Sequence, residues 1–186
     1  MASPTVPKTG TVGGDHPGSP TSDTHTMLDF FYNALLIGIG ATALLDLWAQ
    51  LLRITLRIAT PPWHFVGRWF AGMLQGRFVH SEGINQSPTV AGELAIGWAM
   101  HYVIGVLFAA ALLAIWGVDW VHAPRFIPAL IVGLVTVGAG WFILQPGMGV
   151  GIACSGAPKP NVARLLNIAG HVVFAIGLYG SALLVG

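Results

Sequence analysis

The sequence predicts an all-α integral membrane protein with four transmembrane helices and a short interfacial helix after the first. Hydrophobic residues make up 54% of the chain and charged residues only 8%, whereas a soluble domain carries about 25% charged residues. Four long stretches contain no charged residue, and each stretch can hold most or all of a spanning helix of about 20 residues. These Gly-rich, continuously apolar runs lack the alternation of a barrel strand, so helices are expected to cross the lipid.

Charged residues bound the four expected spans, which run roughly over 29–52, 94–117, 126–145 and 164–185. The Pro61-Pro62 pair ends the first helix, because proline lacks the N–H that a helix interior needs. The segment 63–80 then mixes Trp and Phe with Arg, which is typical of a helix lying in the membrane interface. For a chain of 186 residues, these elements predict a single transmembrane domain, residues 28–186.

Residues 1–27 form a tail dominated by Pro, Gly, Ser and Thr. Such a composition cannot bury enough apolar surface to fold alone, so the tail is expected to be disordered. It has no apolar stretch after a basic start, and therefore it does not read as a signal peptide.

Basic residues predict the orientation, because loops rich in Lys and Arg stay in the cytoplasm. The 53–92 connection holds four arginines and the 146–164 connection holds Lys159 and Arg164, whereas the other side holds only Lys8 and Arg125. We therefore expect both long connections in the cytoplasm and both termini outside it.

Three ionisable side chains are expected to share one depth in the membrane. Asp46 lies within the apolar run LLIGIGATALLDLWAQLL, and His101 and His171 each stand in an apolar stretch of their own. At about 1.5 Å per residue, each lies ~10–12 Å inside the predicted cytoplasmic boundary. Their neighbours four residues away are small or polar, as Gly97 and Gly105 are for His101. Small residues mark helix contacts in membranes, so the three side chains should point into the bundle.

The sequence leaves three interpretations of this Asp/His/His site open. In the first, the carboxylate accepts hydrogen bonds from the imidazoles and holds the helices together, at ~0.6 kcal/mol for each bond. In the second, the residues bind a metal ion, zinc or iron, or the two histidines clamp a haem. In the third, the site relays protons or passes a small substrate. The sequence singles out no catalytic residue and does not indicate an enzyme.

The partner that the composition predicts is the lipid bilayer. A homo-oligomer or a larger membrane complex, respiratory or photosynthetic, stays open, and in such a complex the protein would be a non-catalytic accessory subunit. The net charge of +1 gives no field that would attract nucleic acid. Cys154 is the only cysteine in the sequence, which excludes an internal disulfide and a Cys-based metal cluster.

Further residues are expected to act around the polar site and at the membrane surface. The supporting residues are Gln50, Tyr102, Gln145 and Asn167, and the interfacial residues that contact lipid are Trp63, Arg68, Trp69 and Arg77. Gln145 closes the third span, where it either caps the site or marks the end of the helix.

Several stretches carry a resemblance to a known family. They are LLDLWAQLL in the first span, VGRW and GRFVH after it, GELAIGWAMHYVIGVLFA in the second span, and QPGMGVGIACS with APKPNVARL before the fourth. Together they are similar to a domain-of-unknown-function family of small bacterial inner-membrane proteins, over about residues 28–185. The resemblance implies a multi-span protein of the bacterial inner membrane, which would place both termini in the periplasm, and it carries no activity with it. Leu45 stands where Met is expected before the aspartate, a difference without consequence here.

Overall fold

The protein is all-α in the computed structural model, which describes residues 20–186 and contains no strand in that range. Four helices are long and apolar enough to cross a membrane, over Thr26–Leu56, Glu93–Trp116, Phe126–Gly147 and Pro160–Val185. They correspond to α1 (Pro20–Leu56), α3 (Glu93–Trp116), α4 (Phe126–Ala139) with its continuation, and α6 (Pro160–Val185). The fold class predicted from the sequence is therefore confirmed.

The third span is a composite helix. After α4 the backbone makes a π-helical segment, η3 (Gly140–Leu144), and then a last helical turn, α5 (Gln145–Gly147). The remaining elements are α2 (Trp63–Met73) and three short 3₁₀ turns, η1 (Ile84–Gln86), η2 (Val118–His122) and η4 (Ile152–Cys154). A π-helical turn is uncommon and often lies next to a functional site.

The largest differences from the expected spans lie at the starts of α1 and α6. α1 begins at Pro20, inside the segment expected to be disordered; residues 1–19 of that tail lie outside the described part of the chain. α6 begins at Pro160, ahead of the charge at Arg164 that bounded the expected span. Proline is well suited to the first turn of a helix, because its missing N–H would be unsatisfied there anyway.

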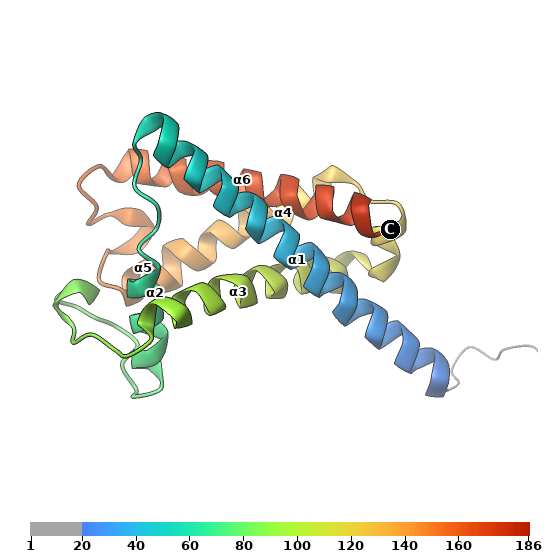
Figure 1. The fold of residues 1–186 in the computed structure, drawn as a ribbon, viewed down its shortest axis with the longest axis horizontal. Helices are drawn as coiled ribbons and strands as arrows, with labels where there is room; N and C mark the ends of the chain where they lie inside the picture. The colour runs from blue at the N-terminus through green and yellow to red at the C-terminus, as the bar shows by residue number, and fades with distance from the viewer. Residues whose placement is uncertain (1–19) are drawn as a thin grey trace, which may run out of the picture.

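The four long helices run alternately up and down (Figure 1). The two long connections, 57–92 and 148–159, lie at one end of the bundle together with α2 and α5. The short connection at η2, the start of α1 and the C-terminus lie at the other end. This arrangement matches the pairing of ends that the basic residues predict, while the assignment of the cytoplasmic side stays a prediction.

Small residues bring the long helices close together. α1 packs mainly against α6 and α3, and α4 packs mainly against α6. A Cβ added at Gly38 of α1 would meet the α3 backbone at Val106, and one added at Gly177 of α6 would meet the α1 backbone at Ala41. Such backbone contact is how helices associate in lipid, where no hydrophobic force draws them together. The predicted inward face of α3 is confirmed, because Gly97, Gly105 and Ala109 are buried.

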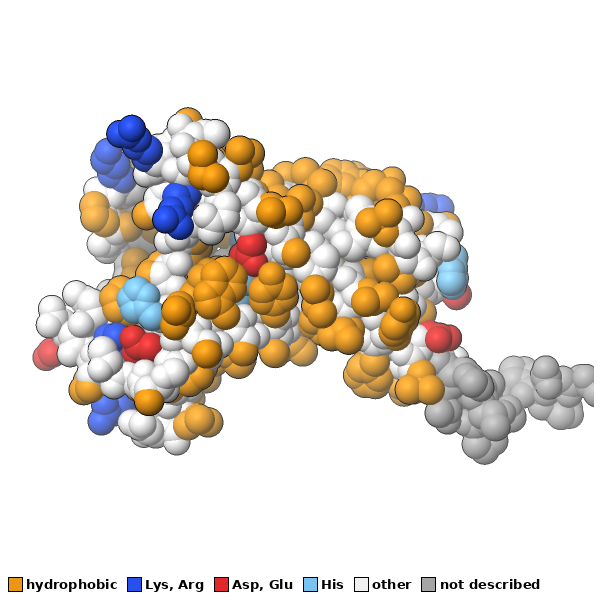
Figure 2. Space-filling view, in the orientation of Figure 1, with side chains coloured by type: hydrophobic (Ala, Val, Ile, Leu, Met, Phe, Trp, Pro, Cys, Tyr) orange, Lys and Arg blue, Asp and Glu red, His pale blue; other side chains and the backbone are white. Residues whose placement is uncertain are grey.

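The outer surface is suited to lipid. Hydrophobic side chains cover the middle of the face seen in Figure 2, and most of the Lys and Arg side chains in view gather at the end that carries the two long connections. Large exposed apolar residues occur on every long helix, for example Leu47, Leu107, Val135 and Leu184. Exposed apolar surface of this extent is typical of a membrane protein.

The short helix α2 packs against α3. Gly67 of α2 and Gly97 of α3 face each other so closely that a Cβ on either would overlap the other helix's backbone. Arg68 then forms a bidentate ion pair with Glu93, with Nε–Oε2 and Nη2–Oε1 distances of 2.8 Å. The consequence is that α2 forms one wall of a cavity between the helices.

Candidate functional site

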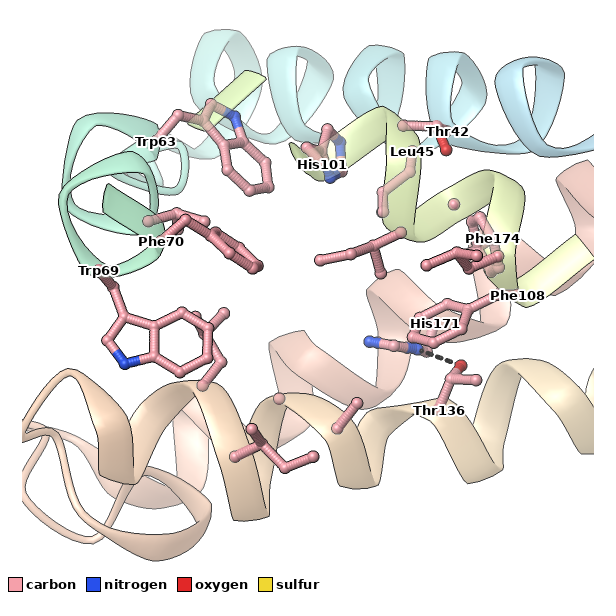
Figure 3. A pocket seen from close by; sticks show the side chains of 18 of the residues that line it. Thr42, Leu45, Trp63, Trp69, Phe70, His101, Phe108, Thr136, His171 and Phe174 are labelled. Atoms are coloured by element: carbon pink, nitrogen blue, oxygen red, sulfur yellow. Dashed lines mark hydrogen bonds between the residues drawn. The ribbon is translucent and has the colours of Figure 1, made fainter. Parts of the chain in front are cut away.

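A cavity of about 460 Å³ opens between the helices. Its walls come from α1, α2, α3, the α4–η3 helix and α6 (Figure 3). The aromatic lining residues are Trp63, Trp69, Phe70, Phe108 and Phe174, and the aliphatic ones include Leu45, Val66, Ile104, Ile143 and Leu144. Two threonines and two histidines add polar groups to this wall: Thr42, His101, Thr136 and His171. The composition is that of a typical small-molecule site, mostly apolar with a few placed polar groups.

Asp46 is held by two consecutive residues of α3. Nε2 of His101 lies 3.0 Å from Oδ1 of Asp46, and the hydroxyl of Tyr102 donates to Oδ2 at 2.9 Å. A carboxylate in an apolar helix is costly unless its oxygens are satisfied, and here both oxygens have a partner. Because a carboxylate oxygen accepts, His101 donates from Nε2. Asp46 itself does not line the cavity; the His101 ring does.

The His101 ring is fixed from a second direction by α2. Trp63 stacks on it, with ring centroids 4.0 Å apart and an interplanar angle of 30°. Trp98 and Tyr102 approach the same ring edge-on, at centroid distances of 5.9 Å and 5.6 Å. One hydrogen bond and one stacked face leave the imidazole little freedom, so it presents a defined surface to the cavity.

His171 is held separately, by α4. Its Nδ1 lies 2.9 Å from the carbonyl oxygen of Gly133 and 3.1 Å from Oγ1 of Thr136. The hydroxyl of Thr136 in turn donates to the same carbonyl at 2.9 Å. Figure 3 shows the other ring nitrogen of His171 directed into the cavity. Gly133 permits this arrangement, because a Cβ there would press on the α6 backbone at His171.

The π-helical segment forms part of the cavity wall. One face of the α4–η3 helix lines the cavity, and its residues are Thr136, Ala139, Gly140, Ile143 and Leu144. Within that face Gly140 leaves open space, since a Cβ built on it would meet no atom within 4 Å. A larger side chain at this position of the wall would therefore extend into free space and not into a neighbouring helix.

The three residues expected to form one polar cluster separate into two groups. Asp46 and His101 are bonded to each other, whereas His171 bonds to Gly133 and Thr136 instead. Both histidines line the same cavity. Among residues 26–186, whose side chains the structure describes, no group of three or more His, Cys, Asp or Glu side chains is arranged to hold a metal ion.

Comparison with known proteins assigns the chain to a family. Residues 35–185 match a family described as "Protein of unknown function (DUF2938)". The chain belongs to this family. The matched range takes in α3, α4 and α6, most of α1, and every lining residue of the cavity, so the candidate site is part of the family domain. No curated protein matches the chain, and no solved structure does.

The predicted supporting residues take different positions within this family domain. Tyr102 bonds to Asp46, as described above, while Gln50 is exposed on α1. Gln145 and Asn167 belong to a second polar cluster at the end of the third span. Asn167 Oδ1 accepts from Trp141 Nε1 at 3.0 Å and from Gln145 Nε2 at 2.9 Å. Gln145 Oε1 accepts from the backbone N–H of Cys154 at 2.7 Å, so this cluster joins the third span to η4 and α6.

The lipid-contact role expected for two residues of α2 is wrong. Arg68 is only 5% exposed, and beyond Glu93 it donates to the carbonyls of Ser87 at 2.9 Å and Ile84 at 3.2 Å. The Glu93 carboxylate raises the pKa of Arg68, so the guanidinium stays charged inside the protein. Trp69 is 6% exposed and donates from Nε1 to the Phe78 carbonyl at 2.9 Å. A guanidinium with this many hydrogen bonds inside the protein holds α2 to α3 and to the 84–87 turn, and it does not bind lipid headgroups.

The other two expected interfacial residues differ from each other. Arg77 is exposed, and its contact with lipid headgroups stays a prediction. Trp63 is half-buried, because one face of its ring lies on His101. Sequence reasoning missed this stacking, the cavity and the role of Thr136. The signal for Thr136 was weak, since a single threonine in an apolar span is usually bonded to its own helix.

Proposed function

We propose that the protein binds a small, lipid-soluble molecule in the cavity between its helices, with His101 and His171 as the polar contacts. The observation that carries this proposal is the cavity itself: about 460 Å³, aromatic walls, and two histidines that face it from different helices. Ligand sites in proteins commonly have volumes of about 300–1,000 Å³ and this mixture of apolar wall and few polar groups.

The positioning of the histidines supports a ligand site over a merely structural cluster. Each ring is held by a partner that does not line the cavity, Asp46 for His101 and the Gly133 carbonyl for His171. Rings locked in this way offer their remaining edges to an occupant without losing further freedom on binding. A cluster that only joined helices would not need two imidazoles on a shared cavity.

A haem is the second candidate, and one observation favours it. Metal-binding histidines usually donate their other ring N–H to a carboxylate or a backbone carbonyl. His101 and His171 donate to one of each. The two candidates differ in a simple readout, because a haem-loaded protein shows a Soret band and an organic ligand without a metal does not.

The test is to identify what the purified protein carries. The protein is isolated in mild detergent, its absorbance spectrum is recorded, and an organic extract is analysed by mass spectrometry per mole of protein. The Gly140→Leu variant adds a large side chain at a position that lines the cavity, and the matched Gly180→Leu variant adds the same side chain to α6 at a position that does not line it. Neither added Cβ meets an atom within 4 Å, so both variants should fold.

We expect a compound that is enriched in the wild type and in Gly180→Leu and depleted in Gly140→Leu. Identical extracts from all three proteins would refute binding in this cavity. The same purification tests the accessory-subunit interpretation, because a stable complex would bring its partner proteins with it. A Soret band that is present in the wild type and absent from Gly140→Leu would identify the bound molecule as haem instead of an organic ligand without a metal.

A further inference from the structure

The proton position on His171 is determined by its partners. The Gly133 carbonyl oxygen, 2.9 Å from Nδ1, can only accept a hydrogen bond, so Nδ1 carries a hydrogen. Thr136 gives its own hydroxyl hydrogen to the same carbonyl, at 2.9 Å. Its oxygen, 3.1 Å from Nδ1, is therefore free to accept from the imidazole. Both neighbours of Nδ1 act as acceptors, and the neutral ring is the tautomer with its hydrogen on Nδ1.

The other nitrogen of His171 is then an acceptor. In the neutral ring Nε2 holds a lone pair and no hydrogen, and Figure 3 shows it directed into the cavity. No ion pair recorded for the described residues includes His171. Charging an imidazole against an apolar wall without a carboxylate is costly. His171 therefore offers the cavity a hydrogen-bond acceptor and not a donor.

We infer that the ligand presents a hydroxyl hydrogen to Nε2 of His171, so that its chemical class is an apolar alcohol or phenol. This inference rests on the proposed function, because it describes the occupant of the same cavity. An ether, ester or ketone of the same skeleton would set an oxygen lone pair against that of Nε2 and leave the nitrogen without a partner. An unpaired polar group in an apolar site costs binding free energy, which gives the site its preference.

His101 is engaged elsewhere. Its Nε2–H donates to Asp46, and Trp63 stacks on one face of its ring. The nitrogen that Figure 3 shows directed into the cavity belongs to His171, so the discrimination between ligand classes is expected to depend on His171.

The experiment compares two probes that differ in one hydrogen-bond donor, 4-tert-butylphenol and 4-tert-butylanisole. Binding is measured by equilibrium dialysis against the protein in lipid nanodiscs, with protein-free nanodiscs as the reference for partition into lipid. We expect the phenol to bind the wild type about 3- to 10-fold more tightly than the anisole, the effect of one net hydrogen bond.

Two variants test the role of His171. His171→Phe removes both ring nitrogens, and His171→Asn keeps an amide N–H that can donate to the Gly133 carbonyl but is too short to place an acceptor at the Nε2 position. In both variants the phenol should lose its advantage while the anisole still binds. In Gly140→Leu neither probe should bind.

The outcomes separate the two proposals. Equal binding of both probes to the wild type, or a phenol preference that persists in both His171 variants, would overturn the inference and leave the cavity a ligand site. No saturable binding of either probe to the wild type, together with no enriched compound in its extract, would overturn the proposed function, and with it the inference.

Discussion

Nε2 of His101 donates to Oδ1 of Asp46 across 3.0 Å, and this bond joins α3 to α1 at the edge of the cavity. Tyr102, the next residue of α3, donates to the other carboxylate oxygen. Two donors on one helix therefore satisfy one charge on another. The side chains of His101 and Asp46 are 11% and 19% exposed, so the pair is largely shielded from its surroundings.

We predict that Asp46 and Tyr102 are energetically coupled. In the Asp46→Asn variant an amide replaces the carboxylate that accepts from both Tyr102 and His101. The amide has only one acceptor oxygen, so one of these two donors faces its N–H group. Tyr102→Phe removes one of the two donors. Unfolding by SDS titration of both single variants and the double variant should give a coupling energy of about 0.6 kcal/mol, with about 1.7 kcal/mol as the upper range for membrane proteins. A coupling energy of zero would mean that the bond contributes nothing to stability.

The second prediction concerns the ion pair between Arg68 and Glu93. Removing one partner of a buried pair leaves the other charge uncompensated, which costs about 3–5 kcal/mol. Arg68→Met and Glu93→Gln should each detach α2 from α3, and limited proteolysis should then cut the 74–92 connection faster. The double variant should be less destabilised than the two single variants together, because it leaves no unpaired charge.

Arg77→Met is the matched control for this prediction. Arg77 has the same side chain in the same connection but is exposed, so its replacement should change stability by less than about 0.5 kcal/mol. If Arg77→Met were as destabilising as Arg68→Met, the effect would arise from the loss of a basic residue in general rather than from the buried pair.

The third prediction is the topology. A reporter fused after Gly186 should be active outside the cytoplasm, and one inserted near Asn85 should be active inside. The 57–92 connection, which contains Asn85, and the C-terminus lie at opposite ends of the bundle, so the two reporters should differ. The basic residues decide which end is cytoplasmic. The reverse result would place the cavity in the periplasmic half and refute the orientation predicted from the charges.

The sequence was sufficient for the helices and for part of the site. Charge-free stretches located the four spans, and the small residues beside His101 identified the face of α3 that is buried. Depth along a helix, however, does not determine the partner across it. His171 lies on an inward face as expected, yet its Nδ1 bonds to the Gly133 carbonyl and to a threonine that resembles any other span residue.

The cavity was beyond sequence reasoning for a different reason. It exists because α2 folds back against α3, and this contact depends on two glycines, Gly67 and Gly97, that are far apart in the chain. The same Trp and Arg content that favoured a helix in the interface also suits a helix packed on a neighbour. Composition does not separate the two, since both require an apolar face with a few cationic side chains.

The last prediction tests this glycine contact. In Gly97→Ala the new Cβ would overlap the carbonyl oxygen of Trp63, a backbone atom that cannot rotate away. α2 must then move, which weakens the stacking of Trp63 on His101 and opens the cavity wall. We expect a loss of about 1–3 kcal/mol in the free energy of unfolding, the usual cost of overpacking.

The Gly140→Ala variant is the control, because its Cβ meets no atom within 4 Å and its backbone is already helical. That variant should be neutral or more stable by up to about 1 kcal/mol, as expected when glycine is replaced by alanine within a helix. If Gly97→Ala were as stable as Gly140→Ala, the close approach of α2 to α3 would not be required, and the cavity wall would need another explanation.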